Sequence, residues 1–115
     1  MENLKQRTKK FALDVIRLVQ MLPRNQTADV IGRQLLRSGT SVAANYRAAC
    51  RARSQADFVN KMGIVEEEAD ETQFWLEMLA EAELVKPEAV ATLARECDEL
   101  VAITVSSIKT ARARQ

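Results

Sequence analysis

Two pairs of glutamates are the residues of this chain whose type and spacing are best suited to chemistry. Glu68 and Glu71 stand three residues apart, and Glu96 and Glu99 repeat that spacing further along the chain. Residues three apart lie on one face of a helix, and carboxylate oxygens are the ligands that Mg²⁺ prefers. Because a bound Mg²⁺ polarises a phosphate, the pattern raises the hypothesis of a magnesium-dependent nucleotide hydrolase.

The helical register favours another interpretation of these carboxylates, a solvated acidic face. Val65 and Ala69 belong to the apolar seam of their helix, so Glu71 points away from that seam. Glu99 points outward in the same way beside Leu100. Since diverging carboxylates do not share one ion, we predict that the chain is not an enzyme and has no catalytic residue, no metal site and no cofactor.

The composition removes most other catalytic arrangements. The sequence has no His, which eliminates Ser-His and Cys-His pairs and the Glu-x-x-His motif of di-iron bundles. Cys50 and Cys97 lie far apart and form no CxxC pair, so the usual zinc and redox arrangements are not expected. We interpret both cysteines as small core residues.

The elements that position these side chains are expected to be helices. The 115 residues include only 3 Gly and 2 Pro, and 47% are apolar, which favours helices over strands. The longest uncharged stretches, residues 38–46 and 100–108, are about half of the length that a membrane span needs. Charged residues interrupt the first apolar segment, so we expect no signal peptide and a cytoplasmic protein without a membrane partner.

Heptad-spaced apolar residues predict an all-α, up-down-up-down antiparallel four-helix bundle, a single domain over residues 1–115. The first helix is expected over residues 3–22. The second runs from an N-cap at Thr27 to Arg53, the third begins at Ser54, and the fourth has Pro87 in its first turn. The predicted core positions are Leu4, Phe11, Val15, Leu18, Leu22, Ile31, Leu35, Ser38, Val42, Asn45, Ala49, Phe58, Met62, Val65, Ala69, Thr72, Leu76, Leu79, Val90, Leu93, Cys97, Leu100, Thr104 and Ser107.

Small residues in the second helix predict a seam where a neighbouring helix approaches closely. Ser38 and Gly39 lie at its centre, and close packing accounts for a glycine inside a helix. Asn45 on the core stripe is expected to fix the helix register. In an antiparallel hairpin that turns near residue 53, Arg37 comes opposite Asp70, so we predict an ion pair between them, joined by Glu66.

Apolar residues outside the core stripes predict self-association. Phe74 and Trp75 lie nearly opposite the core seam of their helix, where a monomer would leave them in water. The candidate residues for an interface between copies are Ile16, Phe74, Trp75, Met78, Val101, Val105 and Ile108.

The charge of the chain is nearly balanced overall but unevenly distributed. Residues 1–53 contain 11 Lys and Arg against 3 Asp and Glu, and residues 54–115 contain 6 against 13. In a bundle, these +8 and −7 halves either neutralise each other, within or between subunits, or leave a basic surface for a polyanion. The candidate residues for binding nucleic acid are Lys5, Arg7, Lys9, Lys10, Arg47, Arg51 and Arg53.

Residues 37–54, residues 56–58 and the acidic stretch 66–77 together resemble one bacterial family of four-helix-bundle proteins. These proteins are encoded in intervening sequences of 23S ribosomal RNA genes. The resemblance follows helix order and length over nearly the whole chain. It implies a ring-like homo-oligomer, a pentamer, without known catalysis. A related bundle is the accessory protein of diversity-generating retroelements, whose basic ring engages reverse transcriptase and nucleic acid.

The sequence thus leads to three functional hypotheses. The first is a non-enzymatic, homo-oligomeric scaffold or accessory protein that contacts structured RNA or DNA through the basic surface of its first two helices. The second is a protein-protein adaptor that binds no nucleic acid. The third is the magnesium-dependent nucleotide hydrolase.

Overall fold

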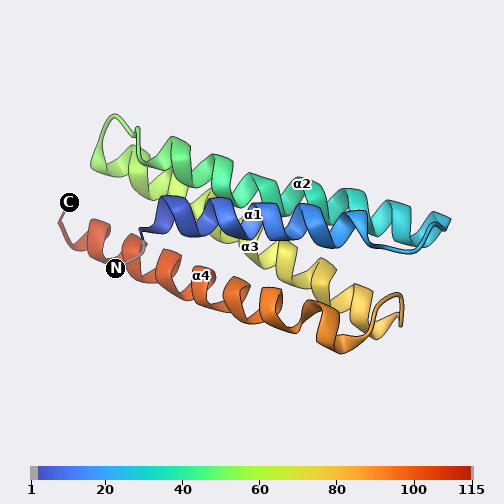
Figure 1. Cartoon of the computed structure of the whole chain (residues 1–115). Helices are drawn as coiled ribbons and strands as arrows, with labels where there is room; N and C mark the ends of the chain where they lie inside the picture. Colours follow the sequence, from blue (N-terminus) through green and yellow to red (C-terminus); the bar gives the residue numbers. More distant parts are fainter. Residues whose placement is uncertain (1–2, 115) are drawn as a thin grey trace.

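Four helices joined by short turns make up the computed structural model, which describes residues 3–114 (Figure 1). They are α1 (Leu4–Gln20), α2 (Gln26–Ala49), α3 (Gln55–Glu81) and α4 (Pro87–Ala113). The helices run up, down, up and down, and the rod that they form measures 48 × 21 × 21 Å. The predicted all-α, antiparallel four-helix bundle is confirmed over the described residues. None of these helices is both long and apolar enough to cross a membrane.

The helix starts follow local capping chemistry. The side chains of Asn3, Asn25 and Ser54 accept hydrogen bonds from backbone N–H groups in the first turns of α1, α2 and α3. Pro87 opens α4, where its missing N–H costs nothing. The predicted starts at Ser54 and Pro87 are correct. The predicted cap at Thr27 is wrong, because Asn25 already caps α2 and Thr27 lies inside the helix.

The second helix also ends earlier than expected. It stops at Ala49 rather than at Arg53, and Cys50 forms its C-cap. Since Ser54 caps α3, the intervening residues are needed to reverse the chain direction. The prediction that Cys50 is a core residue is wrong for this reason, because the turn leaves it exposed. Cys97, in contrast, is buried as predicted.

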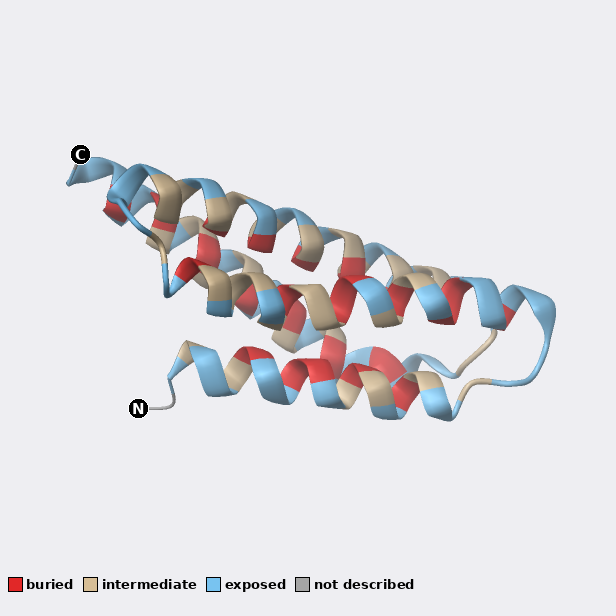
Figure 2. Ribbon diagram, turned by 90° about the horizontal axis from the view of Figure 1, so that it is seen from above, coloured by how far each residue is buried: buried red, intermediate tan, exposed pale blue. Residues whose placement is uncertain are grey.

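The core lies along the inner faces of all four helices (Figure 2). Most of the predicted stripe positions are buried, including Phe11, Leu35, Met62 and Leu76. Near the end of α4 the stripe advances by four residues from Thr104, so Ile108 is buried and Ser107 is not. Ile108 was predicted to lie at an interface between copies, and its burial in this core corrects that prediction.

Close packing is concentrated on one side of the bundle. The α1–α2, α2–α3 and α3–α4 pairs have extensive contacts, whereas α1 and α4 meet at few points. Gly39 of α2 lies so close to α1 that an added Cβ would come within 2.8 and 2.9 Å of the two methyl carbons of Val15. The small-residue seam predicted around Gly39 is therefore present between α1 and α2.

Candidate nucleic-acid interface

The polar groups of the α2–α3 seam do not form the predicted pair. Arg37 Nη1 lies 3.2 Å from Glu68 Oε2, and Arg37 Nη2 bonds Glu71. Asp70 is exposed, because it lies on the opposite side of α3 from Thr72, which faces α2. The prediction of an Arg37–Asp70 pair is therefore wrong. The actual partners lie within one turn of Asp70 along α3, but on a different side of that helix.

Two further polar side chains of α2, Ser38 and Asn45, were predicted to lie at the core. Thr72 Oγ1 lies 3.0 Å from Ser38 Oγ inside the core. Each hydroxyl is also within hydrogen-bond distance of a backbone carbonyl of its own helix, that of Glu68 for Thr72 and that of Leu35 for Ser38, so both buried hydroxyls are satisfied. Asn45, predicted in the core, is only half-buried, and its side chain donates to the Ser41 carbonyl of the preceding turn. Asn45 therefore makes a local helix contact here and no core contact that would fix the register.

Glu71 also accepts a hydrogen bond from the indole N–H of Trp75 at 3.1 Å. This bond, together with the Arg37 guanidinium, lowers the pKa of Glu71 below its ordinary value. The Trp75 ring in turn meets the Phe74 ring edge to face, with centroids 4.9 Å apart. Carboxylate, guanidinium and indole thus form one polar cluster on the surface of α2 and α3.

The second glutamate pair is bound to α1. Arg7 Nε and Nη2 each donate to a Glu96 oxygen at 2.8 Å, and Arg7 Nη2 lies 3.1 Å from Glu99. The hydrogen bonds to Glu96 are the main cause that raises the pKa of Arg7. Both glutamate pairs are thus occupied by arginines. Within residues 3–114, no group of three or more acidic or Cys side chains is placed to hold a metal ion.

The fold gathers basic residues from all four helices at one end of the rod. Both termini lie at this end, with the turn between α2 and α3 (Figure 1). Gln55 at the start of α3 donates to the carbonyl of Ala111 near the end of α4, which places those two helix ends together. We call the cations of residues 3–10, 44–65 and 101–114 the basic end. They are Lys5, Arg7, Lys9, Lys10, Arg47, Arg51, Arg53, Lys61, Lys109, Arg112 and Arg114.

Carboxylates are scarce in the same segments. Asp57 is the one acidic residue in these described segments, and Lys61 binds it at 2.8 Å. That hydrogen bond is the main cause that lowers the pKa of Asp57. Lys10 pairs with Asp14, and Arg7 with Glu96. The other eight cations, all exposed, have no ion-pair partner among residues 3–114: Lys5, Lys9, Arg47, Arg51, Arg53, Lys109, Arg112 and Arg114.

The opposite charge occupies the rest of the α3–α4 hairpin. Residues 66–100 contain 12 Asp and Glu but only Lys86 and Arg95. The division of the charge into a front and a back half of the chain therefore does not describe the folded molecule, because the last turns of α4 join the basic end. Sequence reasoning missed Lys109, Arg112 and Arg114 for this reason. The antiparallel order of the helices would have been enough to find them.

The apolar interface candidates are distributed over several environments. Phe74 is 49% exposed, and Trp75, Met78 and Val101 are half-buried and pack against the edge of the core. Ile16 and Val105 are also half-buried. Phe74 is therefore the most exposed apolar residue of the predicted set. Ile64 of the same helix, which the predicted set did not include, is 39% exposed.

The helices thus define a class of protein, an antiparallel four-helix bundle with a basic end and an acidic α3–α4 hairpin beyond it. Residues 3–106 match the 23S rRNA-intervening sequence protein family, and the chain belongs to this family. A crystal structure of a protein of unknown function of the S23 ribosomal protein family, from Bacteroides thetaiotaomicron, is similar. It is 37% identical, with a TM-score of 0.87 over 93% of this chain and 99% of that chain. A search of curated proteins finds no significant match. The family resemblance predicted from the sequence is confirmed.

Proposed function

We propose that this protein is a non-enzymatic, homo-oligomeric accessory protein that binds the phosphate backbone of structured RNA or DNA through its basic end. The observation that supports the proposal is the group of eight exposed cations at that end that have no ion-pair partner among residues 3–114, contributed by α1, α4 and the end of α2 with its turn. Cations without a carboxylate partner exchange small counterions for phosphates, which makes binding favourable and dependent on salt.

The chemistry of these side chains favours backbone contacts over sequence readout. Arg47, Arg51 and Arg53 present guanidinium groups, whose planar fork matches phosphate oxygens. Contacts of this kind position a protein on a nucleic acid but carry no sequence information. The expected ligand is therefore a folded RNA or a duplex recognised by its shape and charge.

Self-association would increase the effect of a modest basic surface. Phe74 and its neighbours supply the apolar groups that a second copy could cover. If the copies point the same way around a ring, their basic ends gather on one face, and several weak sites act together. The proposed oligomer is the pentamer that the family resemblance implies.

The test measures the affinity for an RNA hairpin and for a DNA duplex by fluorescence anisotropy, over a range of salt concentrations. We expect the parent to bind both, with an affinity that falls at least tenfold between about 50 and 200 mM salt. The triple variant Arg47→Glu, Arg51→Glu, Arg53→Glu should lose at least tenfold in affinity. The matched control carries Arg24→Glu, Arg33→Glu and Lys86→Glu. These substitutions reverse the charge of three exposed residues that lie away from the basic end. Equal losses in the two variants, or no binding by the parent, would contradict the proposal.

An adaptor without nucleic acid is the second candidate, favoured by the exposed Phe74 ring among acidic residues of α3. It predicts that a protein partner stays bound after nuclease treatment and is lost in Phe74→Ala. The hydrolase hypothesis has the least support, because Arg37 and Arg7 occupy the carboxylates that it requires.

A further inference from the structure

The face of α4 that contacts α1 continues past the start of α1. Arg7 of α1 binds Glu96 and Glu99, and α1 begins just before Arg7, at Leu4. α4 runs on to Ala113, which is about 21 Å beyond Glu99 at about 1.5 Å per residue. Within the described chain, the last turns of α4 therefore have no part of α1 beside them.

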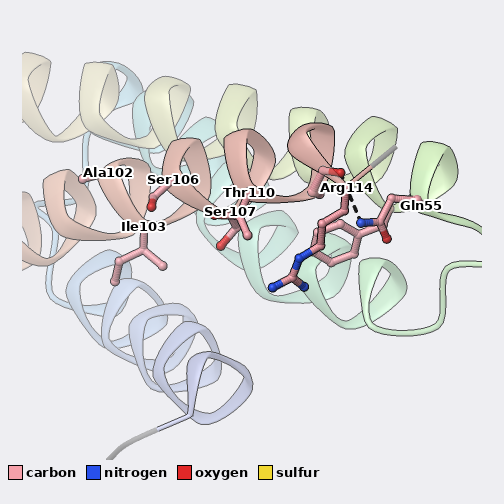
Figure 3. Close-up of a pocket in the computed structure, with 9 residues that line it drawn as sticks. Gln55, Ala102, Ile103, Ser106, Ser107, Thr110 and Arg114 are labelled. Carbon is pink, nitrogen blue, oxygen red and sulfur yellow. Dashed lines mark hydrogen bonds between the residues drawn. The ribbon is translucent and has the colours of Figure 1, made fainter.

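An apolar groove, which we call the α4 groove, lies along this uncovered face and reaches the start of α3. Ile103, Ser107 and Arg114 project from one side of α4 and line it (Figure 3). Ile103 lies one turn after Glu99, on the row of α4 that binds Arg7. The volume of the groove is about 620 Å³, and no residue of α1 within the described chain lines it.

The α4 groove combines an aromatic ring with hydrogen-bonding groups and one cation. Phe58, which is half-buried near the start of α3, contributes the ring. Ser106, Ser107 and Thr110 contribute hydroxyl groups, and Arg114 contributes a guanidinium. No carboxylate of the described chain lines the groove. The matching occupant has a flat apolar face, polar atoms along its edge and a negative charge nearby, which is the chemistry of a nucleotide.

The α4 groove also lies at the basic end. Gln55, one of its lining residues, follows directly after the turn that contains Arg51 and Arg53, and it donates to the carbonyl of Ala111. A nucleic acid held by the exposed cations of this end therefore comes within reach of the groove. In a regular duplex the bases are paired and stacked inside, so only an unpaired nucleotide can turn its base outward into a protein groove.

We propose that the α4 groove binds an unpaired nucleobase of the nucleic acid whose backbone the basic end contacts. The inference rests on the proposed function and narrows its ligand from any duplex to a folded nucleic acid with a bulged or looped-out nucleotide. The base stacks on Phe58, the hydroxyl groups bond its edge, and Arg114 binds an adjoining phosphate. A volume of about 620 Å³ is within the usual range of small-ligand sites and admits one nucleotide.

This contact selects an unpaired nucleotide without selecting a sequence. Stacking on an aromatic ring accepts every base, because every base has a flat π face. The phosphate contacts of Arg51 and Arg53 would hold the backbone whether or not a base enters the groove. Base binding and backbone binding therefore depend on different residues and are separable by experiment.

The experiment compares the affinities for two RNA duplexes by fluorescence anisotropy at one salt concentration. Each duplex carries a single unpaired residue at the same place, an adenosine in one and an abasic residue in the other. The two probes have equal numbers of phosphates and differ only in the base. The parent should bind the adenosine duplex at least about fivefold more tightly, which is the lower end of the effect of base–aromatic stacking.

Three variants that change no charge locate the base contact. Phe58→Leu keeps an apolar side chain but removes the ring, and should reduce the affinity ratio to below about twofold. Ala102→Phe fills the groove from an exposed position of α4 and should have the same effect. Ala91→Phe, the same substitution at an exposed position near the start of α4, is the matched control and should keep the parent ratio. The affinity for the abasic duplex should stay unchanged in all three.

Circular dichroism of every variant shows whether the fold is intact, and the comparison of the two duplexes with the parent requires no variant. A parent that binds both duplexes equally would overturn this inference and leave the proposed function in place, whereas a parent that binds neither would overturn both. A parent ratio that persists in Phe58→Leu and Ala102→Phe would place the base contact elsewhere and also overturn it. The same holds if the parent shows no base preference and Ala102→Phe lowers the mass in light scattering, which would assign the groove to a second copy.

Discussion

The two seams that α1 makes with its neighbours differ in what holds them. Against α2, Gly39 leaves no room for a Cβ, which would lie within 2.9 Å of both methyl carbons of Val15. Against α4, Arg7 reaches across to Glu96 and Glu99 from a helix that otherwise makes few contacts there. The first seam is a close apolar contact, whereas the second is an ion pair at the edge of an opening.

This difference shows that one helix contributes unequally to the stability of its two seams. A tight seam resists any added atom, since cores are packed as densely as organic crystals. An open seam contributes little energy, because a partly exposed ion pair is worth at most about 1 kcal/mol. The open side therefore contributes less to the stability of the bundle than the closed side.

The largest expected effect is at the closed seam. Gly39→Leu should lower the free energy of unfolding by about 3 kcal/mol, because its side chain collides with Val15, which is fully buried and stiff at χ1. Urea denaturation at a fixed protomer concentration measures the loss. Gly63→Ala is the control: an added Cβ there meets nothing within 4 Å, so better helix propensity should stabilise by up to about 1 kcal/mol. Equal effects at the two glycines would refute the close approach.

A second test concerns the closed α3–α4 seam, where the Cys97 thiol donates to the Ala69 carbonyl at 3.0 Å. Burial raises the pKa of Cys97 from 9.0 to about 12. In the unfolded chain the thiol ionises near its ordinary value, so its stabilisation is complete below about pH 9 and is lost as the pH rises toward 12. The expected slope is about 1.4 kcal/mol per pH unit.

Urea denaturation at about pH 8, 9 and 10 measures this slope. Cys97→Ala should flatten it relative to the parent, and Cys50→Ala, at the exposed end of α2, should leave it unchanged. A Cys97→Ala protein with the parent's alkaline slope would mean that water reaches the thiol.

The smallest effect is expected at the open seam. A double-mutant cycle of Arg7→Gln and Glu96→Gln should give a coupling energy of about 0.5 to 1 kcal/mol that decreases with added salt, because both side chains remain partly exposed. Thermal unfolding of the four proteins at low and high salt measures it. A coupling of about 3 kcal/mol, insensitive to salt, would show that this seam is dry and that the contrast with the α1–α2 seam is false.

Much of the fold was predictable because it is encoded in local patterns. Heptad spacing placed Phe11, Leu35 and Leu76 in the core, and the start signals at Ser54 and Pro87 were read correctly. Small residues around Gly39 indicated a close contact between helices, although they did not specify that the partner is α1. In each case the information lies within a few turns of one helix, where spacing alone determines which face is buried.

The candidate sites were less predictable because they depend on rotation and level between helices. The predicted partner of Arg37, Asp70, is one residue away from the actual partner Glu71, and successive residues point about 100° apart around a helix. Ile108 was predicted to lie outside the core, but it is buried in it.

The sequence by itself therefore determined the helices, their inward faces and the balance of charges. The tertiary structure alone decided which carboxylates Arg37 meets and how far α4 extends past the start of α1. The physical reason is that these features depend on the rotation and the relative length of neighbouring helices, which no spacing pattern within a single helix specifies.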